Sequence, residues 1–322
     1  MKRAYRLALA GLLALVVGGL GAPAYAAAFV VNSTTDAHDV VPGNGVCETA
    51  PGNGVCTLRA AVEEANAVAG ADSVSVPAGT YVLLPPPLGR LVIADDVTVI
   101  GAGSSQTIID AGGTDSVLQV TLGKVTTLSG VTLRNGGGAG SSAIINAGSL
   151  TITSSVVTNS GTAAVNGGAI SNTGTLTVNA SQLTNNRGMR GGAIVSPPVP
   201  GSSVTVNDSS IIGNTAATFG GGFATAGPLT VNRSIVRGNT AVDGGGFASL
   251  NLTLTQSEVS GNSAQRGGGV AMSDGTISNS TISSNTAAVF GGGVVLQAGP
   301  LARATAISFT TIAFNVAPAG QG

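Results

Sequence analysis

The sequence predicts an all-β protein folded as a right-handed parallel β-helix, a solenoid of about ten coils with a period near 24 residues and a short α-helical cap at its N-terminal end. Two sets of internal repeats and the composition lead to this prediction. Glycine supplies 50 of 322 residues, charged residues 8% and aromatic residues 3%, so a core must be built from Val, Leu, Ile and Ala. A large and uniform β structure suits such a composition.

The first set of repeats aligns on one asparagine in the C-terminal half. The shared template is an apolar residue, two residues, Ser or Thr, one residue, a second apolar residue, two residues and Asn. Because coils of a β-helix stack at about 4.8 Å, we expect these amides to form a structural ladder at a turn, bonded to the backbone and to each other. The aligned asparagines are Asn186, Asn214, Asn239, Asn262, Asn285 and Asn315.

The second set is a glycine motif that follows each asparagine, read as GGAI, GGGF or GGGV. Its final residues are Ile170, Ile194, Phe223, Phe247, Val270 and Val294, which are 24, 29, 24, 23 and 24 residues apart. The long interval contains three prolines, which cannot donate ladder hydrogen bonds, so a loop insertion is predicted at 196–201. A unit this small cannot bury an apolar face alone, whereas stacked units bury a continuous core.

Residues 1–26 have the three-part layout of a secretory signal peptide. A cationic start precedes an uncharged apolar run over 7–20, and Ala24 and Ala26 supply the small residues for cleavage after Ala26. The run is shorter than the about 20 residues that a transmembrane helix needs, and no later segment could span a bilayer as a helix. We therefore expect a secreted or cell-surface protein, outer-membrane or extracellular; the alternative is an uncleaved anchor.

Residues 27–72 are predicted to form the N-terminal cap. A strand is expected at 29–32 and an amphipathic helix at 58–67, with Thr57 as its N-cap residue. Placed just before the first coil, the helix should cover the open end of the core. Its apolar face consists of Leu58, Ala61, Val62 and Ala65.

Cys47 and Cys56 end two copies of the phrase PGNGVC and are the two cysteines of the chain. In an exported protein this pair indicates a disulfide, and closing a loop of about 10 residues contributes roughly 2–3 kcal/mol. A metal site would require His38 with Asp36 or Asp39 as further ligands, and the spacing does not fit a redox pair. Neither a metal nor a cofactor is expected.

Residues 73–322 are predicted to be the β-helix itself. Its first coils are less regular than the repeats, with strands expected at 97–100, 107–109, 117–120 and 131–133. At the other end, the template places the next glycine motif just beyond Gly322, so the last coil should remain open. Because an uncovered strand edge invites pairing, we expect self-association through this coil; the alternative is a truncated reading frame.

Two parts of the mature chain resemble known families. The stretch 29–66 resembles the N-terminal module named for its Cys-Ser-Leu-Arg-Glu-Ala motif, present here as Cys56-Thr57-Leu58-Arg59-Ala60-Ala61. Ala60 replaces the motif's Glu and removes half of a capping box. The glycine and asparagine repeats resemble those of chlamydial polymorphic outer-membrane proteins. These resemblances imply an exported bacterial β-helix, with adhesion as the usual role of the polymorphic relatives.

The function expected from these features is an adhesin-like or structural binding module without catalysis, with a surface glycan or protein as ligand. Signal cleavage would leave 10 of the 13 basic residues against 14 acidic ones, so nucleic acid is not an expected partner. The arginines nearest to equivalent coil positions are a candidate glycan patch; the alternative is that they only keep the solenoid soluble. These are Arg187, Arg190, Arg233, Arg237 and Arg266.

The competing hypothesis is a polysaccharide-active enzyme resembling pectate lyase, since parallel β-helices commonly host such enzymes. That chemistry needs grouped carboxylates for acid–base work or for calcium. The best candidates are Asp95, Asp96 and Asp110, although their positions are typical of turns. Five of the seven Phe residues fall at core-facing or arc positions of the repeats, which leaves few aromatic residues to stack on sugars.

Overall fold

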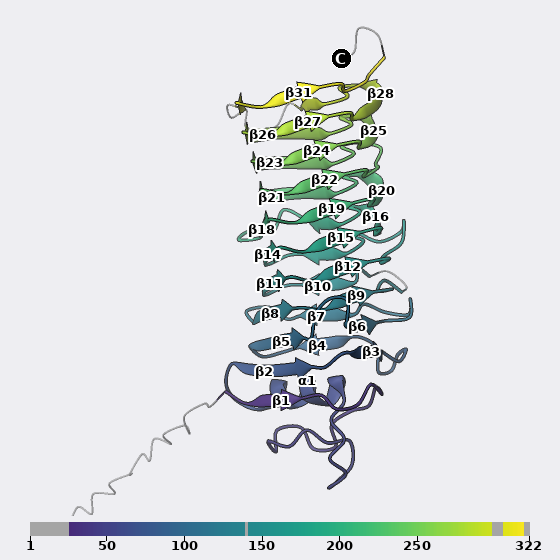
Figure 1. Cartoon of the computed structure of the whole chain (residues 1–322), viewed down its shortest axis with the longest axis vertical. Coiled ribbons are helices and arrows are strands. Elements are labelled where there is room, and N and C mark those ends of the chain that lie inside the picture. The colour runs from purple at the N-terminus through teal and green to yellow at the C-terminus, as the bar shows by residue number, and fades with distance from the viewer. Residues whose placement is uncertain (1–25, 139–140, 298–304, 319–322) are drawn as a thin grey trace, which may run out of the picture.

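The computed structural model describes residues 26–138, 141–297 and 305–318, and it shows a parallel β-helix. Coils stack along one axis, with β1 and α1 at one end and the C-terminal coil at the other (Figure 1). A typical coil contains β13 (Ile170–Asn172), β14 (Thr175–Asn179), β15 (Gln182–Thr184) and β16 (Arg187–Arg190). The predicted fold class is confirmed, and the predicted signal peptide lies almost wholly outside the described residues.

A 17-stranded sheet forms two sides of the solenoid. One series is β1 (Ala28–Val30), β2 (Asp72–Val76), β5 (Val97–Gly101), β8 (Val125–Ser129), β11 (Ser149–Thr153), β14 and β18 (Ser203–Asn207). The other is β4 (Leu91–Ile93), β7 (Leu118–Val120), β10 (Ile144–Asn146), β13 and β17 (Ile194–Ser196). The two merge in β21 (Phe223–Asn232), β23 (Phe247–Thr255) and β26 (Val270–Ser278), followed by β29 (Val294–Leu296) and β30 (Ala306–Ser308).

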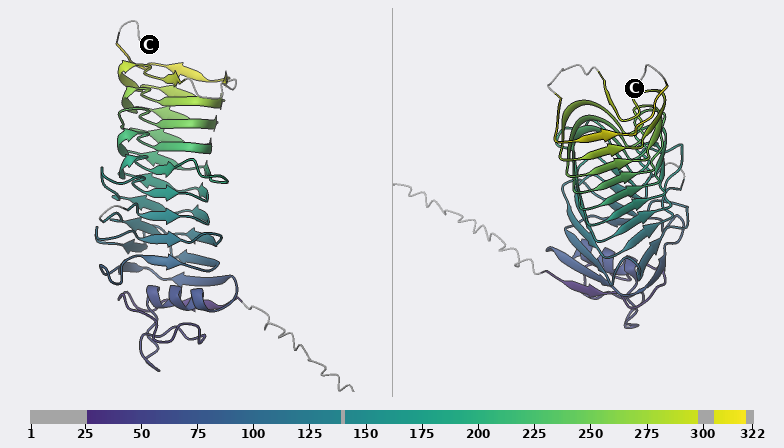
Figure 2. Two further views of the ribbon diagram at one scale, coloured as in Figure 1. Left: turned by 180° about the vertical axis from the view of Figure 1, so that it is seen from behind. Right: turned by 45° about the horizontal axis from the view of Figure 1, so that its top comes forward.

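A 10-stranded sheet forms the next side and contributes one strand to each coil. Its strands are β3 (Gly79–Val82), β6 (Thr107–Asp110), β9 (Thr132–Arg134), β12 (Val156–Thr158), β15, β19 (Ser210–Ile212), β22 (Ile235–Arg237), β24 (Glu258–Ser260), β27 (Thr281–Ser283) and β31 (Thr311–Ala313). Short pairs close the coil: β16 with β20 (Thr215–Phe219), and β25 (Ser263–Arg266) with β28 (Thr286–Phe290). Tilting the stack shows the coils lying over one another (Figure 2).

The core is a set of apolar ladders that run the length of the stack. Alternate residues point inward, as in β11, where Leu150 and Ile152 are buried and Ser149, Thr151 and Thr153 are half-buried. The final residue of each glycine motif lies in one such ladder, since Ile170 pairs with Ile194 and Ile194 with Phe223. Phe223 and Phe247 then stack with ring centroids 4.9 Å apart.

The predicted asparagine ladder is confirmed. The side-chain amide of each asparagine donates to the Oδ1 atom of the next, and these distances are 2.9–3.0 Å from Asn186 through to Asn315. Each amide also donates to a backbone carbonyl, as Asn239 does to Ile211. The ladder therefore satisfies backbone groups at the corner that precedes the glycine motif.

The N-terminal region contains the predicted helix, whereas its strand is β1 at Ala28–Val30 rather than at 29–32. Helix α1 (Leu58–Ala67) has the predicted bounds, and the Thr57 side chain accepts from the Ala60 N–H at 3.1 Å. Its apolar face packs on the first coils, in contact with β2 and β4. Cys47 and Cys56 form a disulfide with Cα atoms 5.1 Å apart. Among the described residues, no helix has both the length and the apolar character needed to cross a bilayer.

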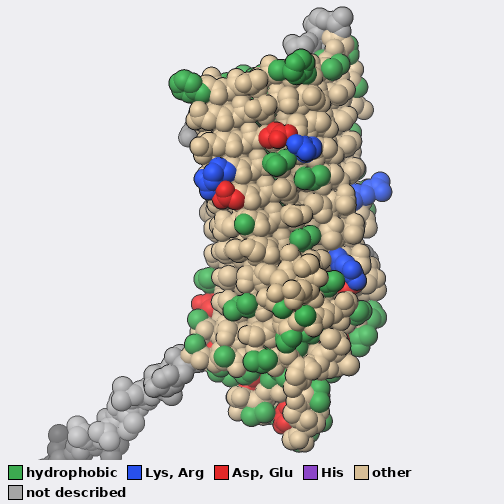
Figure 3. Space-filling view, viewed as in Figure 1, with side chains coloured by type: hydrophobic (Ala, Val, Ile, Leu, Met, Phe, Trp, Pro, Cys, Tyr) green, Lys and Arg blue, Asp and Glu red, His purple; other side chains and the backbone are tan. Residues whose placement is uncertain are grey.

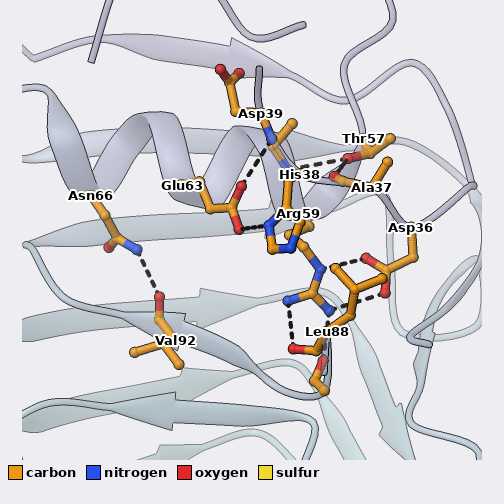
Figure 4. A network of polar contacts seen from close by, with 12 residues as sticks. Asp36, Ala37, His38, Asp39, Thr57, Arg59, Glu63, Asn66, Leu88 and Val92 are labelled. Carbon is orange, nitrogen blue, oxygen red and sulfur yellow. Dashed lines mark hydrogen bonds and ion pairs between the residues drawn. The ribbon is translucent and has the colours of Figure 1, made fainter. Parts of the chain in front are cut away.

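A buried arginine ties the cap to the first coil (Figure 4). Arg59 binds both carboxylate oxygens of Asp36 at 2.8 and 3.0 Å and also donates to the carbonyls of Leu88, Gly89 and Arg90. Arg59 is thus a structural residue that holds the helix against the first coil.

The hypothesis of a metal site at the cysteines is excluded by their pairing. Of the other suggested ligands, His38 lies 2.6 Å from a Glu63 oxygen, Asp36 binds Arg59, and Asp39 accepts backbone N–H groups. The described part of the chain contains no group of three or more His, Cys, Asp or Glu side chains able to hold a metal ion.

Candidate functional site

A groove of about 450 Å³ lies on the outer surface, where β13, β17, β21 and β23 pass one above another. Its floor is a ladder of small, outward-facing residues. Ser171 pairs with Val195, Val195 with Ala224, and Ala224 with Ala248, so that each coil supplies one floor residue. Because small side chains leave room above the sheet, the groove follows the stacking axis.

One wall of the groove is formed by the residue that directly precedes each glycine motif. Asn166, Arg190 and Phe219 occupy this position in three successive coils and line the groove. The next residue turns the chain sharply: Gly220 has a φ of +66°, and a Cβ atom there would lie 1.9 Å from the Phe223 carbonyl oxygen. Glycine is therefore required at that position, and the side chain before it projects to the outside of the corner.

This wall continues toward the C-terminal end as Asp243, Arg266 and Phe290, which are paired in the same register. The Asp243 carboxylate accepts hydrogen bonds from the Arg266 guanidinium in the adjacent coil. The whole ladder therefore alternates cations, aromatic rings and one ion-paired carboxylate.

Arg190 and Phe219 form the most distinctive pair in the groove. The Arg190 guanidinium carbon lies 5.3 Å from the Phe219 ring centroid, a cation–π distance. The ring keeps 40% of its surface exposed. The pair thus presents a planar cation and an apolar ring to the same space.

The opposite wall is less polar. It consists of Pro197 and Pro198 from the predicted loop insertion, together with Ala226, Leu250 and Gln297. The insertion is confirmed as the loop between β17 and β18. Sequence reasoning placed this loop beside a strand but did not show that it borders a groove.

The charge of the groove stands out because most cations of the protein are neutralised. Within residues 26–138, 141–297 and 305–318, seven of the nine Arg and Lys side chains pair with a carboxylate. Most blue side chains on the face shown in Figure 3 accordingly lie against a red one. In those ranges Arg187 and Arg190 have no such partner, and Arg190 is the one that lines the groove.

The five predicted patch arginines do not share one row. Arg190 and Arg266 lie on the groove wall, Arg187 begins β16, Arg233 occupies the corner after β21 with a φ of +45°, and Arg237 ends β22. Three of them bind acidic side chains: Arg233 binds Asp208, Arg237 binds Glu258 and Arg266 binds Asp243. The prediction of a single arginine patch was wrong. The five arginines do not share one position within their coils, so stacking the coils does not bring them together.

The three predicted enzymatic aspartates are not brought together. Asp95 and Asp96 lie in the turn between β4 and β5 of the large sheet, whereas Asp110 ends β6 in the 10-stranded sheet. Asp95 binds Lys124 at 2.8 Å, and that hydrogen bond lowers the pKa of the Asp95 carboxyl. Asp96 accepts the Val125 N–H. Asp95 and Asp96 are thus turn residues, as the alternative interpretation of the sequence had it, whereas Asp110 is the last residue of a strand.

Asp110 borders a second, shallower hollow of about 460 Å³ that is lined mainly by glycines. Burial alone would raise the pKa of Asp110, but hydrogen bonds from Gly112, Asn135 and Arg134 outweigh that effect and lower it. A carboxylate held ionised and already bonded by three donors is poorly suited to accept a substrate proton.

Sequence reasoning missed Phe219, Leu250 and Gln297 as groove residues. The assignment of most Phe residues to core or arc positions is correct for Phe223 and Phe247, which are fully buried, but not for the exposed Phe219. A signal was present, since the residue before each glycine run varies among Asn, Arg, Phe and Asp while the glycines repeat.

Comparison with known proteins gives little beyond the architecture. No family model matches the sequence, and no curated protein matches it. Among solved structures, the A-module of the Azotobacter vinelandii mannuronan C-5 epimerase AlgE4 is similar with a TM-score of 0.39 and 16% identity, over 81% of this chain and 91% of that one. The A-module of the mannuronan C-5 epimerase AlgE6 from the same organism is similar with a TM-score of 0.36 and 16% identity, over 79% of this chain and 94% of that one.

Proposed function

We propose that this protein is an exported, adhesin-like binding module whose groove holds part of an acidic glycan chain without cleaving it. The observation that carries the proposal is the pairing of Arg190, which has no carboxylate partner among the described residues, with the exposed ring of Phe219 on the groove wall. Protein ligands are the competing class for the same surface.

The chemistry of this pair suits a sugar acid. A guanidinium binds a carboxylate through two parallel N–H donors, while the apolar face of a sugar ring packs on an aromatic ring. The floor ladder repeats once per coil at about 4.8 Å, so the groove offers an extended track rather than a closed pocket. A linear acidic polysaccharide matches both features.

Two observations support export. The Cys47–Cys56 disulfide is of a kind that persists in oxidising compartments outside the cytosol. Residues 1–26 also carry the features of a secretory signal, and the stretch 29–66 resembles the cap module of exported β-helices. Secretion or display at the cell surface would place the groove where external glycans are met.

Binding is favoured over catalysis by the composition of the groove. The described residues that line it include no carboxylate, His, Lys or Cys. General acid–base and nucleophilic catalysis on sugars usually draw on such groups. Arg190 supplies positive charge and a planar set of hydrogen-bond donors, which suit binding of an anion.

The test is a calorimetric titration of residues 27–322 with oligogalacturonate, with neutral dextran oligosaccharides as the comparison. Arg190→Ala should weaken binding of the acidic ligand at least about tenfold, equivalent to about 1.4 kcal/mol, and Phe219→Ala should do likewise. The matched control is Arg187→Ala, which removes the same charge from the same strand outside the groove lining.

If the Arg187 and Arg190 variants lost the same affinity for oligogalacturonate, the loss would reflect net charge alone. That result would contradict the groove as the binding site. Binding of the acidic ligand that is unaffected by both changes would contradict the groove as its site, and no binding at all would favour a protein as the ligand of this surface. Release of unsaturated products from polygalacturonate with calcium, abolished by Asp95→Ala, would overturn the proposal in favour of a lyase.

A further inference from the structure

Ala27 is the first residue after the predicted signal cleavage site, and both its N–H and its carbonyl are hydrogen-bonded to the first residues of β2. Its N–H donates to the Asp72 Oδ1 atom at 2.7 Å. Its carbonyl accepts the Ser73 N–H at 2.9 Å, and the Ser73 hydroxyl lies 3.4 Å from the same oxygen. This contact begins the pairing of β1 with β2, in which Ala28 lies opposite Ser73.

Asp72 is the unusual member of this contact. The residue is 1% exposed, and its second carboxylate oxygen, Oδ2, is buried without a hydrogen-bond partner. No Arg, Lys or His of the described residues forms an ion pair with it. Among the residues that the structure describes, the Asp72 carboxylate therefore has no cation beside it in the unprocessed chain. A buried charge without such a partner costs free energy.

We propose that Asp72 is the receptor for the α-ammonium group created when the bond between Ala26 and Ala27 is cleaved. This inference rests on the export proposed above. Hydrolysis breaks the C–N bond, adds the hydroxyl of water to the Ala26 carbonyl carbon and gives the hydrogen to the Ala27 nitrogen. An α-amino group has an ordinary pKa of about 7.7–8.0, so at neutral pH the nitrogen takes up a further proton.

The new group supplies what Asp72 lacks. An amide nitrogen has one N–H, and that hydrogen already points to Oδ1. An ammonium group has three donors and a positive charge, so it can serve Oδ2 as well while neutralising the carboxylate. Cleavage therefore converts an uncompensated buried charge into an ion pair at the base of the solenoid.

The consequence is that processing completes the cap. β1 lies beside α1 and β2 at the N-terminal end of the stack (Figure 1). A precursor that keeps its leader holds β1 by weaker contacts than the mature chain does, so the cap is less stable before cleavage than after it. Ala26 is exposed, which leaves the bond to be cut at the surface.

The test compares residues 27–322, prepared with a free N-terminus at Ala27, with residues 25–322, each with and without Asp72→Asn. The mature chain should melt at least about 3 °C above the extended chain. Asp72→Asn should remove that difference, lowering the Tm of the mature chain much more than that of the extended one. Asp39→Asn is the control, because this buried cap carboxylate accepts backbone N–H groups of Val41 and Glu48. This substitution should lower the Tm of the mature and the extended chain by the same amount.

A second measurement does not depend on the variants folding. Residues 27–322 contain two amines, the α-amine and Lys124. With an amine-reactive acylating reagent at neutral pH, the α-amine of Ala27 should be protected in native protein and labelled in denatured protein. Equal Tm values for the two chain lengths, or a readily labelled α-amine, would overturn the proposal. Expression with the leader in a secreting host tests export separately, because retained protein would contradict export alone.

Discussion

At the scale of single residues, the asparagine ladder shows how a polar side chain becomes part of a core. Asn239 is fully buried, yet its Oδ1 accepts both the backbone N–H and the side-chain amide of Asn214. Its own amide donates to Asn262 and to the Ile211 carbonyl. Each ladder member thereby satisfies groups that a corner would otherwise leave unpaired.

Replacing Asn239 by Ala should therefore cost much more than the loss of one hydrogen bond. Two buried donors of Asn214 lose their acceptor, and each unsatisfied buried group costs about 1–3 kcal/mol. We expect the free energy of unfolding to fall by roughly 2–5 kcal/mol, measured by denaturant titration. Asn315→Ala is the internal comparison, since Asn315 is only part-buried and should lose less. Equal losses at both positions would contradict the role of burial.

The sequence revealed this ladder but not the groove wall, for a physical reason. A ladder that serves the backbone needs the same amide in every coil, so it repeats in the sequence. The wall position before the glycine motif has no such shared role, since Arg190 and Phe219 are exposed there whereas Asp243 is buried and binds Arg266. The groove also depends on an insertion that brings Pro197 beside residues of later coils. Residue spacing alone does not encode that proximity.

At the scale of elements, α1 is the part whose bounds were predicted most closely. Thr57 and the apolar face of the helix are local features, so the helix could be located without tertiary information. The partners of Arg59 could not, because Asp36 and the carbonyls of 88–90 lie 23 to 31 residues away in the chain. The arginine nevertheless decides how firmly the helix holds the first coil.

Arg59→Ala should destabilise the cap by about 3–5 kcal/mol, because it leaves the buried Asp36 carboxylate without its cation. Arg90→Ala is the matched control: this arginine also binds one aspartate, Asp115, but keeps 30% of its side chain exposed, so its removal should cost clearly less. Thermal unfolding and hydrogen exchange of α1 would measure both. A cap that exchanges no faster in the Arg59 variant than in the wild type would contradict this assignment.

At the scale of the whole molecule, the two ends of the solenoid differ. Helix α1 and β1 cover the first coils, as Figure 1 shows. At the other end, β30 and β31 pair with β26 and β27, and within the described residues no strand lies on their other side. Phe309 and Phe314 in this coil are 88% and 86% exposed. Within the described residues, the solenoid therefore has one end covered by α1 and β1 and one end that exposes apolar side chains.

We predict that a polypeptide of residues 27–322 dimerises through its C-terminal coil. The opposite end carries helix α1 beside its short edge strand β1, whereas two C-terminal coils related by a two-fold axis can each satisfy the open strand edge of the other. Such an isologous contact closes at two copies and does not propagate into filaments. The predicted self-association of the last coil thus takes a specific form.

Light scattering over a range of concentrations should show a monomer–dimer equilibrium, which Phe309→Asp and Phe314→Asp together shift to the monomer. Leu122→Asp is the control: Leu122 is 83% exposed in the loop between β7 and β8, far along the stack from the C-terminal coil, and an added charge there should leave the dimer intact. A monomer at all concentrations would contradict the contact, and growth beyond the dimer would contradict its two-fold closure.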